Sequence, residues 1–367
     1  MTQRFLFIST CLLTVLLAKA QMKTRNVVSN VYNNVYIDRN DDGSVLQNDM
    51  VAYKMSLPDD TIEFLKADNS DKKMPVFVFV QGSQPIPLVL NYGNNLTATF
   101  LNNIDKGVLS KYHVIEITMP NTPLYCDSTF LDDQCRYIPT GKPMEFDYNY
   151  VRRNHLDTYL TRAYSVIDYI TTQQWADRNN IVVFGHSQGA YIAVALAARE
   201  KRISAVGLAS FCPLGRMQGQ VIEARLNGIA GKTTIQQATD KIKEISDYWR
   251  YLQNADDKEY QKNRKGDLPS TTKSFSQPVF EKISKLSQPV FIAYGTSDYH
   301  SVLCDLFPLY FAQYEKENYK VVPMSGRGHN FENINEDGTH DWNDIKWHEV
   351  TSEFLKFVDS HKNKNLK

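Results

Sequence analysis

The chain has 367 residues, of which 42% are hydrophobic and 22% are charged, and this is typical of one large α/β domain or two ordinary ones. Lysine plus arginine equals aspartate plus glutamate at 41 each, so the formal net charge is zero. This balance excludes a long-range field that would attract nucleic acid or an anionic membrane surface, and we expect no nucleic-acid partner.

The first twenty residues are typical of a signal peptide. Arg4 gives a positive start, the apolar run "FLFISTCLLTVLLA" follows, and Ala18-Lys19-Ala20 places small residues where a signal peptidase cleaves. The run is too short for a transmembrane helix, which needs about 20 residues. We therefore expect cleavage near Ala20/Gln21, a secreted or periplasmic location, no stable membrane span and a mature domain of residues 21–367. A retained amphipathic anchor is the alternative.

Strand-like and helix-like segments alternate from residue 31 onward, which indicates an α/β fold with a mostly parallel sheet and helices on both faces. "VYNNVYI" and "VAYKMSL", on either side of the turn-forming "RNDDGS", predict an opening hairpin. Continuous apolar runs predict strands buried on both faces at 74–83 and 113–120. Apolar residues spaced three or four apart predict a helix over 156–175.

The second half of the chain continues the alternation. We expect strands at 181–184, 203–210, 289–295 and 319–325, a helix from 188 to about 201, and a closing amphipathic helix within 344–362. The interval of about 215–286 has many charges, helix-like pieces and no strand of the core type. We interpret it as a helical cap inserted over the carboxyl edge of the sheet, with a solvated surface excursion as the alternative.

Four cysteines follow the predicted signal peptide, and an oxidising compartment favours their pairing. Cys126 and Cys135 enclose the short segment "CDSTFLDDQC", and we predict a disulfide between them. Cys212 and Cys304 each follow a predicted strand and could pair at one sheet edge or remain as buried free thiols. No CxxC pair or histidine cluster has zinc spacing, so we expect no metal and no cofactor.

The pentad "GHSQG" matches GxSxG and lies between a predicted strand and a predicted helix, the setting of a nucleophile elbow. Side chains at positions 185 and 189 would collide with the neighbouring strand and helix, which explains the two glycines. Ser187 would project from the carboxyl edge of the sheet at a helix start, where free N–H groups favour a developing anion. An ordinary serine at a helix cap is the alternative.

A serine hydroxyl needs a base, and the base needs an orienting acid. Asp298 follows the glycine that ends its strand by three residues, and His329 lies in a glycine-rich loop just beyond the last strand. We predict a catalytic set of Ser187, His329 and Asp298. His300 is the rival base, and Asp305 and Asp341 are substitutes for the acid.

Two backbone N–H groups are expected to form an oxyanion hole. One belongs to Gln188, directly after the nucleophile, and the other to Ser83, in the "VQGSQ" segment after an earlier strand. Gly82 would let the backbone turn into position. A turn without a catalytic role is the alternative for this segment.

Residues 74–359 resemble the α/β-hydrolase superfamily through "VQGSQ", "GHSQGA", "GTSDYHS" and "GRGHNF". The last three motifs contain the nucleophile, the acid and the base, in the chain order of that superfamily. The resemblance implies acyl transfer through a covalent serine ester, with His329 as base and the N–H groups of Ser83 and Gln188 around the oxyanion. Many members have His-Gly where this chain has Gln81-Gly82, a departure in the first loop. The cap after the sixth strand is similar to that of esterases, thioesterases and dienelactone-hydrolase-like enzymes.

We therefore expect an exported serine esterase whose substrate is a small-molecule acyl ester. The first alternative is a serine peptidase or amidase of the prolyl-oligopeptidase-like type, although residues 21–73 are too few for a propeller domain. The second is a non-catalytic binding protein on a hydrolase scaffold. The sequence indicates nothing about oligomeric state.

Overall fold

The structure is a computed structural model that describes residues 27–39, 45–142, 146–258 and 266–362. The predicted signal peptide and its cleavage site lie outside the described residues, as do residues 40–44 of the turn between the first two strands. Among the described residues, no helix has both the length and the apolar character needed to cross a bilayer.

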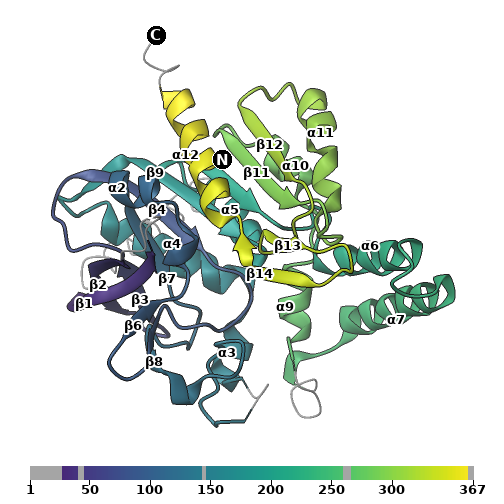
Figure 1. The fold of residues 1–367 in the computed structure, drawn as a ribbon, viewed down its shortest axis with the longest axis horizontal. Coiled ribbons are helices and arrows are strands. Elements are labelled where there is room, and N and C mark those ends of the chain that lie inside the picture. The colour runs from purple at the N-terminus through teal and green to yellow at the C-terminus, as the bar shows by residue number, and fades with distance from the viewer. Residues whose placement is uncertain (1–26, 40–44, 143–145, 259–265, 363–367) are drawn as a thin grey trace, which may run out of the picture.

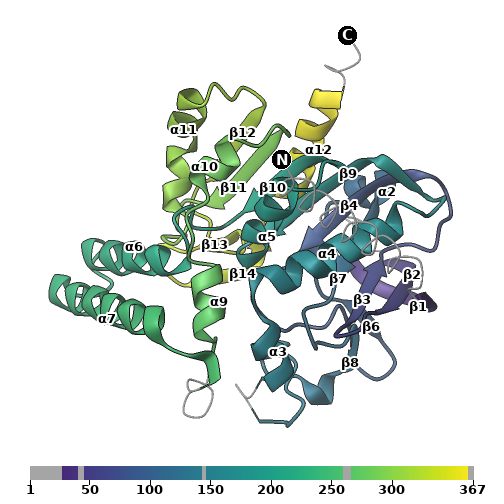
Figure 2. The same cartoon turned by 180° about the vertical axis from the view of Figure 1, so that it is seen from behind.

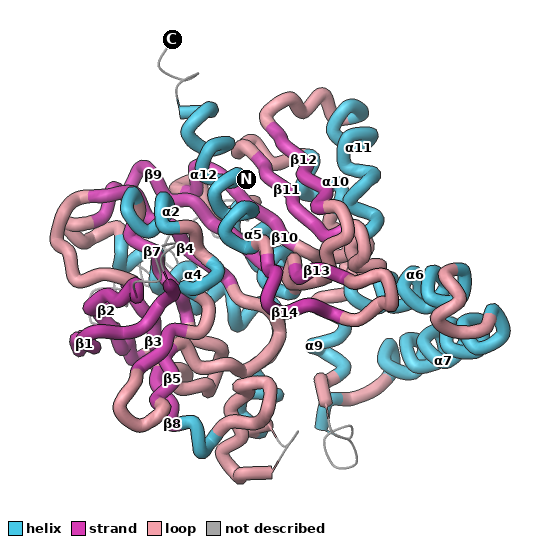
Figure 3. The backbone as a smooth tube through the Cα atoms, viewed as in Figure 1, coloured by secondary structure: helices cyan, strands magenta, loops and turns pink. Residues whose placement is uncertain are grey.

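Twelve strands form one sheet in the order β12-β11-β10-β9-β4-β7-β3-β2-β1-β6-β5-β8, and two more form a separate hairpin, β13-β14 (Figure 3). The strands are β1 Val27–Arg39, β2 Val45–Ser56, β3 Thr61–Lys66, β4 Met74–Val80, β5 Val89–Asn91, β6 Leu96–Ala98, β7 His113–Ile117, β8 Tyr125–Asp127, β9 Ala176–His186, β10 Ile203–Ala209, β11 Val290–Gly295, β12 Tyr319–Met324, β13 Glu332–Ile334 and β14 His340–Ile345.

Helices separate and follow these strands (Figure 1). The α-helices that lie wholly within the described residues are α2 Lys106–Lys111, α3 Tyr148–Arg153, α4 Leu156–Ile170, α5 Gln188–Ala197, α6 Arg216–Ile229, α7 Ile235–Asn254, α9 Pro269–Ser274, α10 Phe280–Ser284, α11 Phe307–Gln313 and α12 Trp347–Lys362. Short 3-10 helices are η2 Leu101–Asn103, η3 Ser128–Phe130 and η4 Val302–Leu306.

The middle of the sheet is parallel, from β7 through β4, β9, β10 and β11 to β12. Strands β3, β2 and β1 extend it in antiparallel pairing beyond β7. Because parallel strands end at the same edge, the loops after β4, β9, β11 and β12 meet on one side of the molecule. This edge carries every side chain of the predicted catalytic set.

Both faces of the central strands β4, β7, β10 and β11 are buried, as the continuous apolar runs predict. Side chains alternate between the faces along each strand: Val76 and Val78 of β4 join one core with residues of α4, α5, α10 and α11, whereas Phe77 and Phe79 join a second core with residues of α2 and α12. Every residue of α5 is buried, because its small side chains let the helix pack closely against the sheet.

The predicted α/β fold with a mostly parallel sheet is confirmed, whereas several element ends differ and several short strands and helices were not predicted. The helix predicted over 156–175 ends at Ile170, where two turns lead into β9. The helix after the elbow ends at Ala197 rather than near residue 201. Strand β3 was not predicted, although it joins the opening hairpin to the parallel part of the sheet.

The cap interval, which we define as residues 215–286, contains helices α6, α7, α9 and α10 and no strand among its described residues. Helices α6 and α7 lie side by side and project from one side of the molecule in both views (Figures 1 and 2). Gly228 permits this close approach, since a Cβ there would lie 2.7 Å from the Cβ of Ala238.

The predicted disulfide between Cys126 and Cys135 is wrong, because all four cysteines among the described residues are free thiols. Cys126 lies on β8 with its Sγ 3.4 Å from the carbonyl oxygen of Asp127, whereas the Sγ of Cys135 lies 4.0 Å from the hydroxyl of Tyr92. The two sulfur atoms therefore contact different neighbours. Of the two possibilities for Cys212 and Cys304, the structure has the buried free thiols.

Candidate active site

Ser187 occupies a strained turn between the end of β9 and the start of α5. Its backbone has φ 55° and ψ −118°, a region that residues other than glycine seldom adopt, and its N–H donates to the carbonyl of Ala209 at 2.8 Å. The hydroxyl makes no capping hydrogen bond to the helix. It is thus left available to a side chain on another loop.

The two glycines of the pentad stand where backbone segments cross. A Cβ at Gly189 would overlap the carbonyl oxygen of Val80 on β4, and a Cβ at Gly185 would overlap the carbonyl oxygen of Gly189. Both positions would be well inside 3.0 Å of backbone atoms, which cannot swing away as a side-chain end can. The collision expected from the sequence is therefore present at both glycines.

Gly189→Ala is expected to destabilise the fold by about 3 kcal/mol, because α5 would have to move away from β4. The comparison is Gly93→Ala, whose Cβ meets nothing within 4 Å but whose φ of 82° makes a side chain strained. That variant should lose only about 1 kcal/mol. Urea unfolding measures both free energies, and equal losses would show that the close approach at Gly189 is unimportant.

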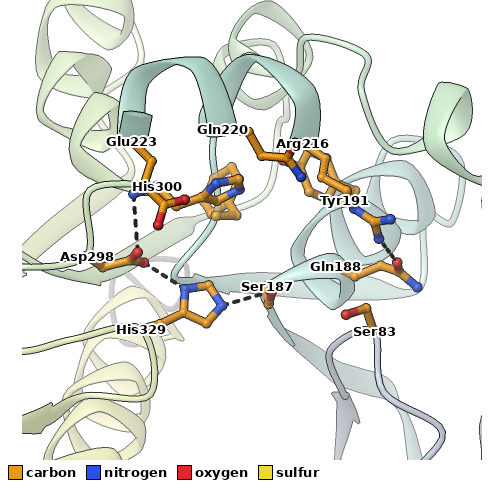
Figure 4. A pocket seen from close by; sticks show the side chains of 11 residues that line it. Ser83, Ser187, Gln188, Tyr191, Arg216, Gln220, Glu223, Asp298, His300 and His329 are labelled. Carbon is orange, nitrogen blue, oxygen red and sulfur yellow. Dashed lines mark hydrogen bonds and ion pairs between the residues drawn. The ribbon is translucent and has the colours of Figure 1, made fainter. Parts of the chain in front are cut away.

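His329 joins Ser187 and Asp298 into one hydrogen-bonded chain (Figure 4). Its Nε2 lies 3.0 Å from the Oγ of Ser187, and its Nδ1 lies 2.8 Å from Oδ2 of Asp298. With the proton on Nδ1 donated to the carboxylate, Nε2 is free to accept the serine proton. The three predicted residues are thus brought together, from the loops after β9, β11 and β12.

The carboxylate of Asp298 is held in its charged form. Its burial raises the pKa, but the charge and hydrogen bond of His329 and the hydroxyl of Ser301 outweigh burial and hold the pKa below its usual value. The N–H of His300 also donates to Oδ1 at 3.3 Å. Burial by itself lowers the pKa of His329, yet the same carboxylate raises it above its usual value.

The two substitutes for the acid have partners other than His329. The carboxylate of Asp305 accepts from the hydroxyl of Tyr294, and that of Asp341 accepts from the N–H of Asn343 at 2.9 Å. His300 lines the same cavity, and burial lowers its pKa to about 4. Among the described residues, the imidazole hydrogen-bonded to the hydroxyl of Ser187 is that of His329.

Ser83 and Gln188 both lie beside Ser187 (Figure 4). Gln188 is the first residue of α5, so its N–H points out of the helix N-terminus, where the helix dipole is positive. Ser83 follows β4 by three residues and lines the same cavity as Ser187. A Cβ at Gly82 would lie 3.6 Å from the Cβ of Ser187, so the loop after β4 passes close to the nucleophile turn.

His186, within the pentad, supports the loop that carries His329. Its Nε2 lies 3.2 Å from the carbonyl oxygen of His329, and its ring lies between those of His329 and Trp347, with centroids 5.1 Å and 4.9 Å away. Burial lowers the pKa of His186 to about 3, so the ring is neutral and can donate from Nε2. The sequence had assigned it no role.

A cavity of about 320 Å³ opens above the three residues (Figure 4). Helix α6 forms one wall with Arg216, Gln220 and Glu223, which are spaced four and three residues apart and so share a helix face. The sequence analysis missed these residues, although their spacing in a predicted helical interval is the signal that could have found them. The cavity wall is therefore polar and charged.

The arrangement can transfer a proton from a hydroxyl to a neutral imidazole and stabilise the resulting imidazolium with a buried carboxylate. Backbone N–H groups at a helix start can stabilise negative charge on a substrate oxygen beside the same hydroxyl. Among the described residues, no group of three or more histidine, cysteine, aspartate or glutamate side chains is arranged to hold a metal ion.

Comparison with protein families finds that a model described as the alpha/beta hydrolase fold matches residues 144–331, just over half of the chain. The matched segment contains all three residues of the predicted catalytic set. Comparison with curated proteins finds no relative.

Several solved structures are similar to this chain. DcsB in complex with its substrate analogue has 13% sequence identity and a TM-score of 0.46, with 91% of this chain and 99% of that chain covered. A putative dienelactone hydrolase from Klebsiella pneumoniae has 11% identity and a TM-score of 0.44, with coverage of 91% and 99%. A putative dipeptidyl aminopeptidase IV from Bacteroides ovatus has 11% identity and a TM-score of 0.44, with 92% of this chain but only 36% of that chain covered.

Proposed function

Because the chain belongs to the alpha/beta hydrolase fold family, we propose that it is a serine hydrolase that cleaves carboxylic esters with Ser187, His329 and Asp298. The observation that carries the proposal is the pair of hydrogen bonds of His329, 3.0 Å to the Ser187 hydroxyl and 2.8 Å to the Asp298 carboxylate. A nucleophile, a base and an orienting acid in this geometry are what acyl transfer requires.

In the proposed reaction the Oγ of Ser187 attacks the ester carbonyl carbon while Nε2 of His329 takes the hydroxyl proton. The carbonyl oxygen becomes an oxyanion that accepts hydrogen bonds from the N–H groups of Ser83 and Gln188. The C–O bond to the alcohol then breaks, and His329 returns the proton to the leaving oxygen. Water, deprotonated by His329, then attacks the acyl carbon. The bond between this carbon and the Oγ of Ser187 breaks, His329 returns its proton to Oγ, and the acid is released.

The cavity supports a small-molecule acyl ester as substrate. Its volume of about 320 Å³ is at the small end of the range for ligand sites. We further propose that the cap interval is an inserted cap, since α6 of this interval lines the cavity. The proposal also includes export, which rests on residues 1–20; it predicts that the secreted or periplasmic protein begins at Gln21, as measured by intact mass.

A fluorophosphonate probe tests the nucleophile. The native protein is expected to be labelled covalently and Ser187→Ala is not, because the probe forms its bond with an activated serine. Ser246→Ala, which removes an exposed hydroxyl on α7, is the matched control and should be labelled like the native protein. Equal labelling of the native protein and Ser187→Ala, or no labelling of either, would contradict the proposal.

Paired substrates separate the ester proposal from its alternatives. We expect the native protein to hydrolyse p-nitrophenyl acetate or butyrate much faster than the corresponding p-nitroanilide. Preference for the anilide would instead support a peptidase or amidase. Binding of an ester without turnover of either substrate would support a non-catalytic binding protein.

A further inference from the structure

One short segment, residues 150–154, contacts both residues that we propose as oxyanion donors. Tyr150, on α3, donates its hydroxyl hydrogen to the carbonyl oxygen of Ser83 at 2.6 Å. Asn154, which follows α3, accepts at Oδ1 from Nε2 of Gln188 at 3.0 Å. We name residues 150–154 the support segment.

Asn154 and Gln188 belong to a closed ring of four side chains. Nδ2 of Asn154 donates to Oδ1 of Asp267 at 3.0 Å, and the guanidinium of Arg216 donates to Oδ2 of the same carboxylate at 2.5 Å. Arg216 also donates to Oε1 of Gln188, which closes the ring. Both amide groups thus have a donor and an acceptor in use. We name Asn154, Gln188, Arg216 and Asp267 the amide ring.

The two amides of the amide ring are buried, whereas its ion pair is partly exposed. Asn154 and Gln188 are 1% and 3% exposed, and the hydroxyl of Tyr159 donates to Oδ1 of Asn154 at 2.8 Å. The guanidinium of Arg216 lies over the ring of Phe275, 5.4 Å from its centroid. At the two buried amides a missing partner would leave a polar group unpaired, so their hydrogen bonds favour this one arrangement.

We propose that Tyr150 and Asn154 are positioning residues for the oxyanion hole, an inference that rests on the proposed function because it presupposes the two N–H donors. Tyr150 holds the loop after β4, and Asn154 with the rest of the amide ring holds the first residue of α5. Neither side chain needs to touch the substrate. Since the full oxyanion develops only towards the transition state, displaced donors slow the reaction step more than they weaken substrate binding.

The amide ring also links the cap interval to the catalytic edge. Arg216 and Asp267 come from the cap interval, whereas Asn154 and Gln188 come from the sheet-covering part of the chain. The Arg216–Asp267 ion pair belongs to the cap interval. It is linked to the first turn of α5 because Arg216 also donates a hydrogen bond to the side chain of Gln188. Loss of Asp267 is expected to act on the oxyanion hole although Asp267 does not line the cavity.

The test compares Tyr150→Phe, Asn154→Ala and Asp267→Ala with the native protein on p-nitrophenyl butyrate. Each variant is expected to lower kcat about 10-fold, less than the 100-fold or more typical of losing an oxyanion donor, and to leave KM within about twofold. A trifluoromethyl ketone, which forms a tetrahedral oxyanion adduct with serine, should bind each variant about 10-fold more weakly. A purely structural role would not weaken the ketone selectively.

Two matched variants control for loss of a hydroxyl and of an ion pair. Tyr112→Phe removes another buried tyrosine hydroxyl, which contacts Lys362 at the opposite edge of the sheet. Asp247→Ala removes an exposed carboxylate from the cap interval, where it pairs with Arg250. Both controls should keep the native kcat and the native affinity for the ketone.

Double variants identify which residues act together. Tyr150→Phe and Asn154→Ala support different donors, so their effects on kcat should multiply to about 100-fold. Asn154→Ala and Asp267→Ala disrupt the same ring, so the double variant should be little worse than either single one. If one single variant fails to fold, the remaining ring or tyrosine variant still measures the effect on ketone binding.

The outcomes separate this inference from the proposed function. If the native protein is active and the three variants match it in kcat and ketone affinity, the positioning role is overturned and the serine hydrolase stands. If the variants raise KM and leave kcat unchanged, the residues act in substrate binding and the inference is also overturned. If the native protein neither turns over an ester nor reacts with the fluorophosphonate probe, both proposals fall together.

Discussion

Asp298→Asn is expected to lower kcat by about 10⁴-fold with little change in fold. The asparagine amide would place an N–H where the carboxylate now accepts from Nδ1 of His329, 2.8 Å away. The imidazole would then carry its proton on Nε2, the atom that has to accept the proton of Ser187. The wrong tautomer and the loss of the carboxylate charge would both lower kcat.

The pH dependence gives a second readout of the same variant. The kcat/KM of the native protein should fall as the pH falls through the pKa of His329, which Asp298 raises above the usual value of 6.5. Without this carboxylate the residual activity should persist to lower pH. Asp305→Asn is the matched control and should stay within about threefold of native kcat. Comparable losses in the two variants would contradict the assignment of Asp298.

Glu116→Gln is expected to raise the free energy of unfolding at pH 9 by up to about 5 kcal/mol. Glu116 lies on β7 between β3 and β4, is 2% exposed, and neither carboxyl oxygen has a hydrogen-bond partner among the described residues. Burial raises its pKa to about 8 from an ordinary 4.5. The folded state therefore favours the protonated carboxyl, whereas the unfolded chain ionises from about pH 4.5.

The free energy of unfolding of the native protein is therefore expected to decrease as the pH rises. The favourable contribution of protonated Glu116 is complete below pH 4.5, decreases as the pH rises, and is lost above pH 8. Urea unfolding between pH 5 and 9 should show this decline in the native protein and a flatter profile in Glu116→Gln. Glu244→Gln, on the exposed surface of α7, should change the free energy by less than about 0.5 kcal/mol. Parallel profiles for the native protein and Glu116→Gln would refute the effect.

Much of the fold could be predicted because hydrophobic periodicity reports burial directly. The strands around Val78 and Val183 are buried on both faces, and such strands appear in the sequence as unbroken apolar runs. Ser187 and its two glycines could be placed because a sharp strand-to-helix turn leaves a fixed sequence pattern. The positions of Asp298 and His329 followed from the rule that parallel strands end at one edge.

Other features depend on contacts between distant segments, which single-sequence patterns do not report. Strand β3 is short and ends in Lys66, a buried lysine whose ammonium group donates to the carboxylate of Asp68 and to the carbonyl of Ser70. The pairing of Cys126 with Cys135 was predicted from their separation in sequence, but the thiols contact different residues in the structure. The contacts of Tyr150 and Asn154 join segments that no local pattern connects.

The strained backbone of Ser187 lowers the stability of the fold at the residue whose hydroxyl is proposed to react. A non-glycine residue at φ 55° and ψ −118° costs of order 1–3 kcal/mol, and this cost falls on the residue that is proposed to react. A glycine there would relax the turn and remove the hydroxyl together. Selection for thermal stability alone would therefore favour glycine at this position and give an inactive protein. A catalyst that retains this turn needs enough stability elsewhere in the fold to offset the strain.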